Sequence, residues 1–259
     1  MATLRRPTTI AASVLAAALV AWVVTIERMR GMDAGPGTDL GALGWFVGIW
    51  VTMMAAMMLP SAAPMVLMFA RVSRERSGSR EARAVPTWTF VGGYLLAWTL
   101  YGLFAFAVWR GLRSATPSFF AWSSAGPWIA GGALAAAGAY QLTPLKSVCL
   151  RRCRSPLSFV LGAWREGRGG ALLMGLEHGA FCVGCCWGLM SALFALGVMS
   201  LFWMTVVAAV IYAEKTTFAG ERLALVLAVV LVVLGIWVAA APASVPGLTQ
   251  PHGLQMRMK

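Results

Sequence analysis

The chain has 259 residues, of which 59% are apolar and 12% are charged, and its mean hydropathy is +0.76. A soluble domain of this length could not bury so much apolar surface, so the composition excludes a soluble globular protein and predicts one covered by lipid. The formal net charge of +12 would indicate nucleic acid for a soluble protein. In a membrane protein the cations instead mark topology, and no nucleic-acid partner is expected.

Long apolar windows follow one another along the sequence. A bilayer core about 30 Å thick needs roughly 20 apolar residues per helical span. We therefore predict an all-α fold, a polytopic transmembrane helical bundle of about seven spans in a single membrane domain over residues 1–259. The spans are expected at residues 10–26, 40–70, 87–109, 126–142, 170–198, 201–213 and 223–240. The sixth is short and is expected to form a tight hairpin with the fifth through residues 197–200, and residues 243–259 are expected to form a mobile tail.

Lysines and arginines gather in alternate connections of this arrangement. Most of the 21 cations precede the first span or follow the second, the fourth and the sixth. Because cytoplasmic loops carry an excess of Lys and Arg, the N-terminus is predicted to be cytoplasmic and the C-terminus outside. A cleaved signal peptide is the alternative for the first window, but about 17 residues is long for a signal core. An uncleaved span is the simpler interpretation.

The second window is interrupted by prolines and is rich in methionine. Pro60 and Pro64 predict a kink. Four methionines form two adjacent i, i+4 pairs, which are Met53 with Met57 and Met54 with Met58. Thioether sulfur is a ligand for Cu(I) but a poor one for Zn(II), and methionine also fills gaps in cores. The four side chains are therefore candidate metal ligands or core residues.

The basic connection YQLTPLKSVCLRRCRSP carries Cys149 and Cys153. Arg151, Arg152 and Arg154 beside them are expected to favour the thiolate forms. A permanent disulfide is not expected in a reducing cytoplasm. The pair is a candidate secondary site that receives or delivers metal, or a redox couple; the alternative is two ordinary thiols in a loop that binds lipid headgroups.

Potential metal donors gather in the fifth window. In EHGAFCVGCCWGLM the residues His178, Cys182, Cys185 and Cys186 stand at i, i+4, i+7 and i+8 and share one stripe of a helix. Thiolate and imidazole are the ligands that Cu(I), Zn(II) and iron–sulfur clusters select. Cysteine also serves as a small apolar side chain, but this density of donors within lipid favours a metal site.

The stripe cannot converge fully on one ion, because His178 and Cys186 are about 12 Å apart along a straight helix. We expect the site to use Cys182 with Cys185 or Cys186 and to be completed by methionines of the second window. Thiolates with thioether sulfur favour Cu(I), and zinc is the alternative.

The fifth window also carries recurring glycines and one acid. The glycines, at positions 175, 179, 184 and 188, predict the close approach of another helix. Glu177 points about 100° away from His178 and is a candidate proton relay or a partner for a polar group such as Gln141. A buried protonated carboxyl is the alternative.

Several long motifs together resemble a known family. They are MMAAMMLPSAAPM, GYLLAW, YQLTPLKSVCLRRCRSP, HGAFCVGCCWGLM and the pair Glu214 and Lys215. From about residue 45 to residue 215 the chain is similar to a bacterial family of predicted metal-binding integral membrane proteins, domain of unknown function number twenty-one eighty-two. The resemblance implies metal binding and a multi-pass place in the bacterial inner membrane, and it supplies no reaction.

These features lead to one preferred hypothesis and two alternatives. We expect a membrane protein that binds a soft metal, Cu(I), at a mid-membrane Cys/His/Met site for transport or delivery, and that is not an enzyme. The first alternative is a membrane thiol–disulfide oxidoreductase. The second is an assembly factor for a respiratory metalloenzyme. The expected partners are the lipid bilayer and a metal chaperone or a respiratory enzyme subunit.

Overall fold

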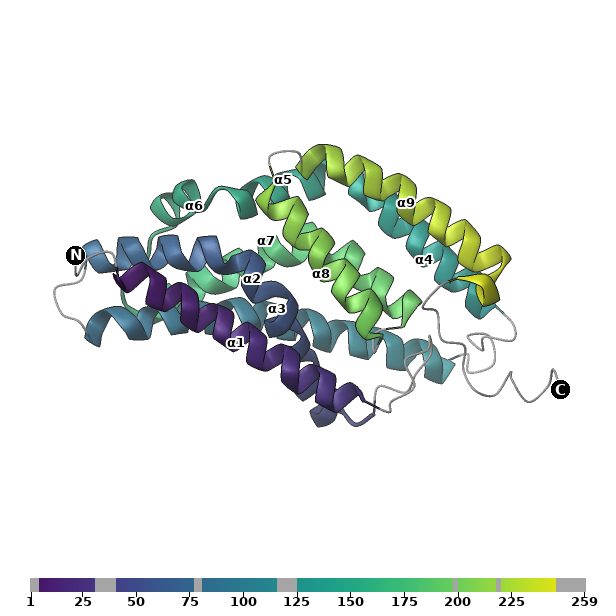
Figure 1. Cartoon of the computed structure of the whole chain (residues 1–259), viewed down its shortest axis with the longest axis horizontal. Helices are drawn as coiled ribbons and strands as arrows, with labels where there is room; N and C mark the ends of the chain where they lie inside the picture. Colours follow the sequence, from purple (N-terminus) through teal and green to yellow (C-terminus); the bar gives the residue numbers. More distant parts are fainter. Residues whose placement is uncertain are drawn as a thin grey trace. The chain divides into compact units, whose positions relative to one another are not determined.

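The computed structural model describes residues 5–30, 41–76, 81–115, 125–197, 200–217 and 220–245. Every regular element in this described part is helical, which confirms the predicted all-α fold. The elements are α1 (Arg5–Met29), α2 (Leu43–Arg76), α3 (Glu81–Ala115), α4 (Gly126–Gln141), α5 (Pro144–Arg154), α6 (Pro156–Gly162), α7 (Gly167–Leu196), α8 (Leu201–Thr216), α9 (Gly220–Ala240) and the 3₁₀ helix η1 (Pro242–Ser244) (Figure 1). Most of the expected tail, residues 246–259, lies outside the described residues.

Five of the described helices are long and apolar enough to cross a membrane, namely α1, α2, α3, α7 and α9. This is the pattern of an integral membrane protein. The two other expected spans correspond to α4 and α8, which have 16 residues each. At 1.5 Å per residue such a helix is about 24 Å long, shorter than the hydrocarbon core. Seven is therefore an approximate span count.

The break expected between the fifth and sixth windows is present. α7 ends at Leu196 and α8 begins at Leu201. Gly197 has a φ of 105°, a conformation that favours glycine, and it follows the last residue of α7 directly. Residues 198 and 199 lie outside the described part, so the hairpin itself stays a prediction.

The basic connection after α4 is helical, which corrects the expectation of a loop. It forms α5 and α6, separated by Ser155. Pro144 and Pro156 each occupy a first helical turn, where proline has a suitable φ and its missing N–H is not needed. Because α5 is a helix, Cys149 and Cys153 lie one turn apart on the same face.

The chain divides into two compact units. The first unit combines residues 1–28, 44–103 and 148–185, and the second combines residues 29–43, 104–147 and 186–259. The helices α3, α5 and α7 each continue from one unit into the other. One membrane domain over residues 1–259 stays a prediction.

In the first unit, α3 and α7 approach each other closely because glycines face the backbone of the neighbouring helix. A Cβ atom at Gly93 would collide with the carbonyl of Leu172, and one at Gly175 would collide with the carbonyl of Phe90. The expectation that small residues in the fifth window admit a neighbouring helix is thereby confirmed. The same contact brings Tyr94 of α3 next to α7.

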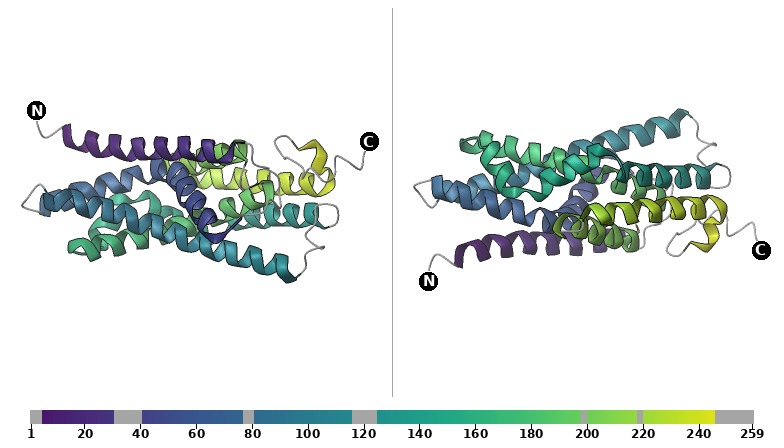
Figure 2. Two further views of the ribbon diagram at one scale, coloured as in Figure 1. Left: turned by 90° about the horizontal axis from the view of Figure 1, so that it is seen from below. Right: turned by 90° about the horizontal axis from the view of Figure 1, so that it is seen from above.

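In the second unit, α4 and α9 lie side by side (Figure 1), and Figure 2 shows the same pair from two further directions. Gly131 and Gly235 face each other in this contact, where a Cβ on either residue would collide with the other helix. A similar approach places Gly138 against the carbonyl of Ala228. Small residues therefore decide the helix contacts in both units, as expected where lipid offers no hydrophobic driving force between helices.

Candidate metal centre

Three thiols lie together on α7. The Sγ atoms of Cys182, Cys185 and Cys186 are all within 4.8 Å of one another, and each residue is at most 1% exposed. Spacings of three and four residues make them neighbours on one helical face. With metal–sulfur bonds of about 2.3 Å, two sulfurs on one tetrahedral ion are about 3.8 Å apart, so small side-chain rotations would close this group on an ion. The sequence analysis named all three thiols as candidate ligands and expected Cys182 with Cys185 or Cys186 to bind the ion.

The phenol of Tyr94 contacts this group. Its oxygen lies 3.0 Å from Sγ of Cys182, and the residue is 1% exposed. Sγ of Cys185 lies 3.2 Å from the carbonyl oxygen of Cys182. Hydrogen bonds of this kind hold ligand side chains in place before an ion binds. Sequence reasoning missed Tyr94, and the one signal for it was its position within the motif GYLLAW.

A fourth thiol reaches the group from another helix. Sγ of Cys153 on α5 lies 3.8 Å from Sγ of Cys185. Cys153 is half-buried, whereas the three thiols of α7 are fully buried. The sequence had treated the cysteines of α5 as a separate secondary site. The structure joins one of them, Cys153, to the group on α7.

Cys149, the other thiol of α5, occupies a different environment. It is 7% exposed and packs against Gly184, where a Cβ atom would lie 2.7 Å from Sγ of Cys149. Burial raises the pKa of the Cys149 thiol above its usual value. The expectation that nearby arginines favour its thiolate is therefore wrong for Cys149, because burial disfavours the charged form of the thiol. All five cysteines lie in the described helices, and none forms a disulfide.

His178 lies one turn before Cys182 and outside the group of three thiols. It is 3% exposed and is surrounded by aromatic rings. The ring centroids of Tyr94 and Phe159 are 5.6 Å and 5.5 Å from its own, and that of Phe90 is 6.1 Å away. Its role as a ligand stays a prediction. One of these rings, that of Tyr94, also contacts the sulfur group through its phenol oxygen.

The four methionines of the second window all lie in the core. Met53, Met54, Met57 and Met58 on α2 are at most 2% exposed. This burial fits both a ligand role and a packing role. Their part in metal binding stays a prediction.

Glu177 pairs with Arg165, with 3.4 Å between its carboxylate oxygen and the guanidinium nitrogen. The side chain of Glu177 is 33% exposed and that of Arg165 is 49% exposed. The exposure of Glu177 contradicts the alternative of a buried carboxyl, while a partnership with Gln141 stays a prediction. A role for Glu177 as a proton relay stays a prediction.

A buried ion pair in the second unit was not foreseen. Nζ of Lys146 lies 2.6 Å from Oε1 of Glu214, and both side chains are 1% exposed. The sequence analysis had counted Lys146 among the cations that mark topology. Glu214 belonged to a motif, but no partner for it could be inferred. Breaking such a pair leaves one charge buried without its counter-charge, which is costly.

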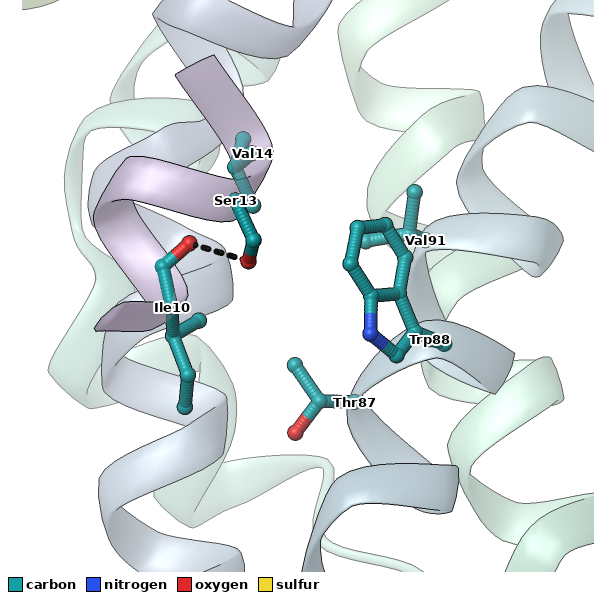
Figure 3. Close-up of a pocket in the computed structure, with 6 residues that line it drawn as sticks. All are labelled: Ile10, Ser13, Val14, Thr87, Trp88 and Val91. Carbon is teal, nitrogen blue, oxygen red and sulfur yellow. Dashed lines mark hydrogen bonds between the residues drawn. The ribbon is translucent and has the colours of Figure 1, made fainter. Parts of the chain in front are cut away.

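The small pocket between α1 and α3 offers no comparable chemistry (Figure 3). Its volume is about 60 Å³ and its lining is mostly apolar, formed by Ile10, Ser13, Val14, Thr87, Trp88 and Val91. The hydroxyl of Ser13 donates to the carbonyl of Ile10 (Figure 3). These six side chains carry no thiol, imidazole or carboxylate, so the sulfur group remains the candidate centre.

The donor set of the sulfur group suits a soft metal ion. Its thiols are buried, close together and flanked by the Tyr94 phenol. Thiolates select Cu(I), Zn(II) and iron–sulfur clusters over hard ions such as Mg²⁺. The arrangement can therefore hold an ion such as Cu(I), and donor type alone does not separate copper from zinc.

Comparison with curated proteins and with solved structures finds no match. A family model described as PpoB2, copper chaperone, matches residues 47–238, which include every cysteine and all four methionines of the second window. This match supports the expectation of a copper-related family, while the particular family named from the motifs stays a prediction. Since the match covers most of its length, the chain belongs to the PpoB2 copper chaperone family.

Proposed function

We propose that this chain binds Cu(I) through Cys182, Cys185 and Cys186 and passes the ion to a protein partner at the membrane. The observation that carries the proposal is the group of three buried thiols in a chain of a copper chaperone family. Cu(I) is a soft ion with a single charge, so thiolate sulfur suits it and few thiolates are needed to neutralise it. A buried site also keeps water away from the bound ion.

The methionines of α2 are proposed as helpers. Met54 and Met58 are fully buried, one turn apart. A neutral thioether adds affinity for Cu(I) without adding charge, whereas zinc gains little from it. Participation of these residues would therefore favour copper over zinc. If zinc is bound instead, His178 is the proposed nitrogen donor.

Delivery is the proposed use of the bound ion. The expected setting is the inner membrane of a bacterium, and the expected acceptor is a metal chaperone or a subunit of a respiratory enzyme during its assembly. Ligand exchange between the sulfur group and an acceptor needs no chemical conversion of the ion. The alternative use of the same binding site is the transport of copper across the bilayer.

A second candidate function is thiol–disulfide exchange. The observation in its favour is the 3.8 Å contact between Sγ of Cys153 and Sγ of Cys185. In such a reaction the two thiols would lose two protons and two electrons, and a quinone would take them up while the disulfide forms. A stable oxidised form with two fewer titratable thiols would favour this function.

The proposed function is tested on the full chain purified in detergent under reducing conditions. Cu(I) affinity is measured by competition with a chromophoric Cu(I) chelator, and bound metal by elemental analysis. Cys182→Ser, Cys185→Ser and Cys186→Ser should each weaken Cu(I) binding at least about tenfold. The matched control is Cys149→Ser, which replaces a buried thiol outside the group. A Cu(I) affinity equal to that of wild type in all three variants of the sulfur group would contradict the proposal.

A further inference from the structure

We infer that Cys153 is the exchange ligand of the sulfur group: it takes Cu(I) from a thiolate-bearing carrier and passes it to Cys185. The inference rests on the proposed function and assigns the point at which the ion enters. It gives Cys153 a role that Cys149 does not share, although the sequence presents the two cysteines as an equivalent pair.

Burial distinguishes Cys153 from the other four thiols. Cys149, Cys182, Cys185 and Cys186 are at most 7% exposed, whereas Cys153 is half-buried. A carrier-bound ion must contact an accessible ligand first, because a folded carrier cannot enter the packed core. Cys153 is the one cysteine of this chain that combines accessibility with a contact to the buried group.

The position of α5 beside α7 is fixed by contacts near Cys153. The guanidinium of Arg152 lies 5.5 Å from the ring centroid of Phe181. Cys149 packs against Gly184, which leaves space for its sulfur because it has no side chain. These two contacts hold α5 against α7, so Sγ of Cys153 stays next to Sγ of Cys185.

The charge around Cys153 suits an anionic carrier. Arg151 and Arg152 are exposed and Arg154 is half-buried. Thiolate complexes of Cu(I) carry negative charge when the thiol belongs to an acidic peptide, so the arginines would attract them. The chemical class of the donor is therefore an acidic thiol that carries Cu(I).

The transfer is an exchange of ligands without redox chemistry. The sulfur of Cys153 forms a bond to Cu(I) as the bond between Cu(I) and the carrier sulfur breaks. The proton of the Cys153 thiol passes to the departing carrier thiolate, and the ion stays Cu(I). Cys185 then replaces Cys153 in the same way, returning a proton to Cys153, and the ion is enclosed by the buried thiols.

The test follows transfer from the Cu(I)–glutathione complex to the full chain in detergent, with both rate and affinity measured. Cys153→Ser should slow uptake roughly tenfold or more and leave the Cu(I) affinity within about threefold of wild type. Cys182→Ser should instead lower the affinity. Cys149→Ser is the matched comparison on α5 and should take up the ion at the wild-type rate. Elution of each variant as a single species in size-exclusion chromatography checks that it is folded.

Three results would overturn the inference. The first is a wild-type uptake rate in Cys153→Ser. The second is a loss of affinity in Cys153→Ser as large as in Cys182→Ser, which would make Cys153 a resident ligand. The third is equal slowing by Cys149→Ser. A wild-type chain that binds no Cu(I) at equilibrium would instead remove the proposed function, so the two failures are distinguishable.

Discussion

The phenol oxygen of Tyr94 lies 3.0 Å from Sγ of Cys182, and this contact connects α3 to the sulfur group of α7. When Cys182 is a thiolate, the phenol donates to it. A donor of this kind holds the sulfur in one orientation and stabilises its charge in surroundings that contain little water. The contact can be tested by Tyr94→Phe, a substitution that removes only the phenol oxygen.

Tyr94→Phe should weaken Cu(I) binding by about 1 kcal/mol, or roughly fivefold in Kd, because one hydrogen bond to the thiolate is lost. The ring contact with His178 should remain, since phenylalanine keeps the ring. The measurement is competition with a Cu(I) chelator at fixed pH. Tyr212→Phe on the exposed face of α8 is the control and should not change the Kd. Equal affinity in wild type and Tyr94→Phe would show that the phenol has no influence on the site.

The second prediction concerns the two thiols of α5. Burial raises the pKa of Cys149, so its thiolate fraction at any given pH is smaller than that of an ordinary cysteine. Alkylation of Cys149 should therefore be slow near neutral pH and accelerate only as the pH rises above the usual thiol range. Cys153, which is half-buried, should react first.

Inside-out vesicles, a membrane-impermeant alkylating reagent and mass spectrometry of the α5 peptide provide the measurement. Both thiols should be labelled from the cytoplasmic face. Labelling from the outer face alone would contradict the topology, and equal rates for the two thiols would contradict their different burial.

The third prediction concerns the buried pair of Lys146 and Glu214. Lys146→Met or Glu214→Gln alone should lower the free energy of unfolding by roughly 3–5 kcal/mol, because the remaining partner stays buried without its counterpart. The double variant should lose much less than the sum of the two single losses. Thermal unfolding in detergent at pH 7 gives the stability of wild type, the two single variants and the double variant, which together form a double-mutant cycle. Arg222→Met, which removes an exposed cation of α9, is the control. Additive losses in the double variant would show that Lys146 and Glu214 do not interact.

The all-α fold could be predicted from the sequence, because the apolar length of a spanning helix depends on bilayer thickness. The orientation that the cations indicate stays a prediction. The end of α7 before Gly197 and the glycine contact of α7 with α3 were also predictable, because both depend on glycines that the sequence shows directly. The helix α5 was not, because its polar composition suggested a loop. As a result, the approach of Cys153 to Cys185 and the pairing of Lys146 with Glu214 could not be inferred. Both depend on contacts between segments that are distant in sequence.

The fourth prediction tests the arrangement in the membrane. A reporter fused at Gly78, which lies outside the described residues, should report the cytoplasm, because the cations around it favour that side. A reporter at the C-terminus should report the outside if all seven expected spans cross. Both reporters on the same side would contradict seven spans and would indicate that α4 or α8, with 16 residues each, does not cross.

The last prediction concerns the methionines of α2 and the identity of the metal. Met54 and Met58 are fully buried and lie one turn apart on α2. Replacing both by leucine keeps side-chain volume and helix propensity, so the abundance of the folded protein should stay near normal. If their thioethers contact the ion, the Met54→Leu/Met58→Leu variant should bind Cu(I) less tightly than wild type in chelator competition, while its Zn(II) affinity should not change, because zinc gains little from neutral sulfur.

Met65→Leu is the matched control, since Met65 is equally buried on α2 but lies two turns beyond Met58. It should leave the affinities for both ions unchanged. Unchanged copper affinity in the Met54→Leu/Met58→Leu variant would remove these methionines from the site. The cysteines would then bind without thioether help, and zinc or thiol–disulfide exchange would become the stronger hypothesis for them.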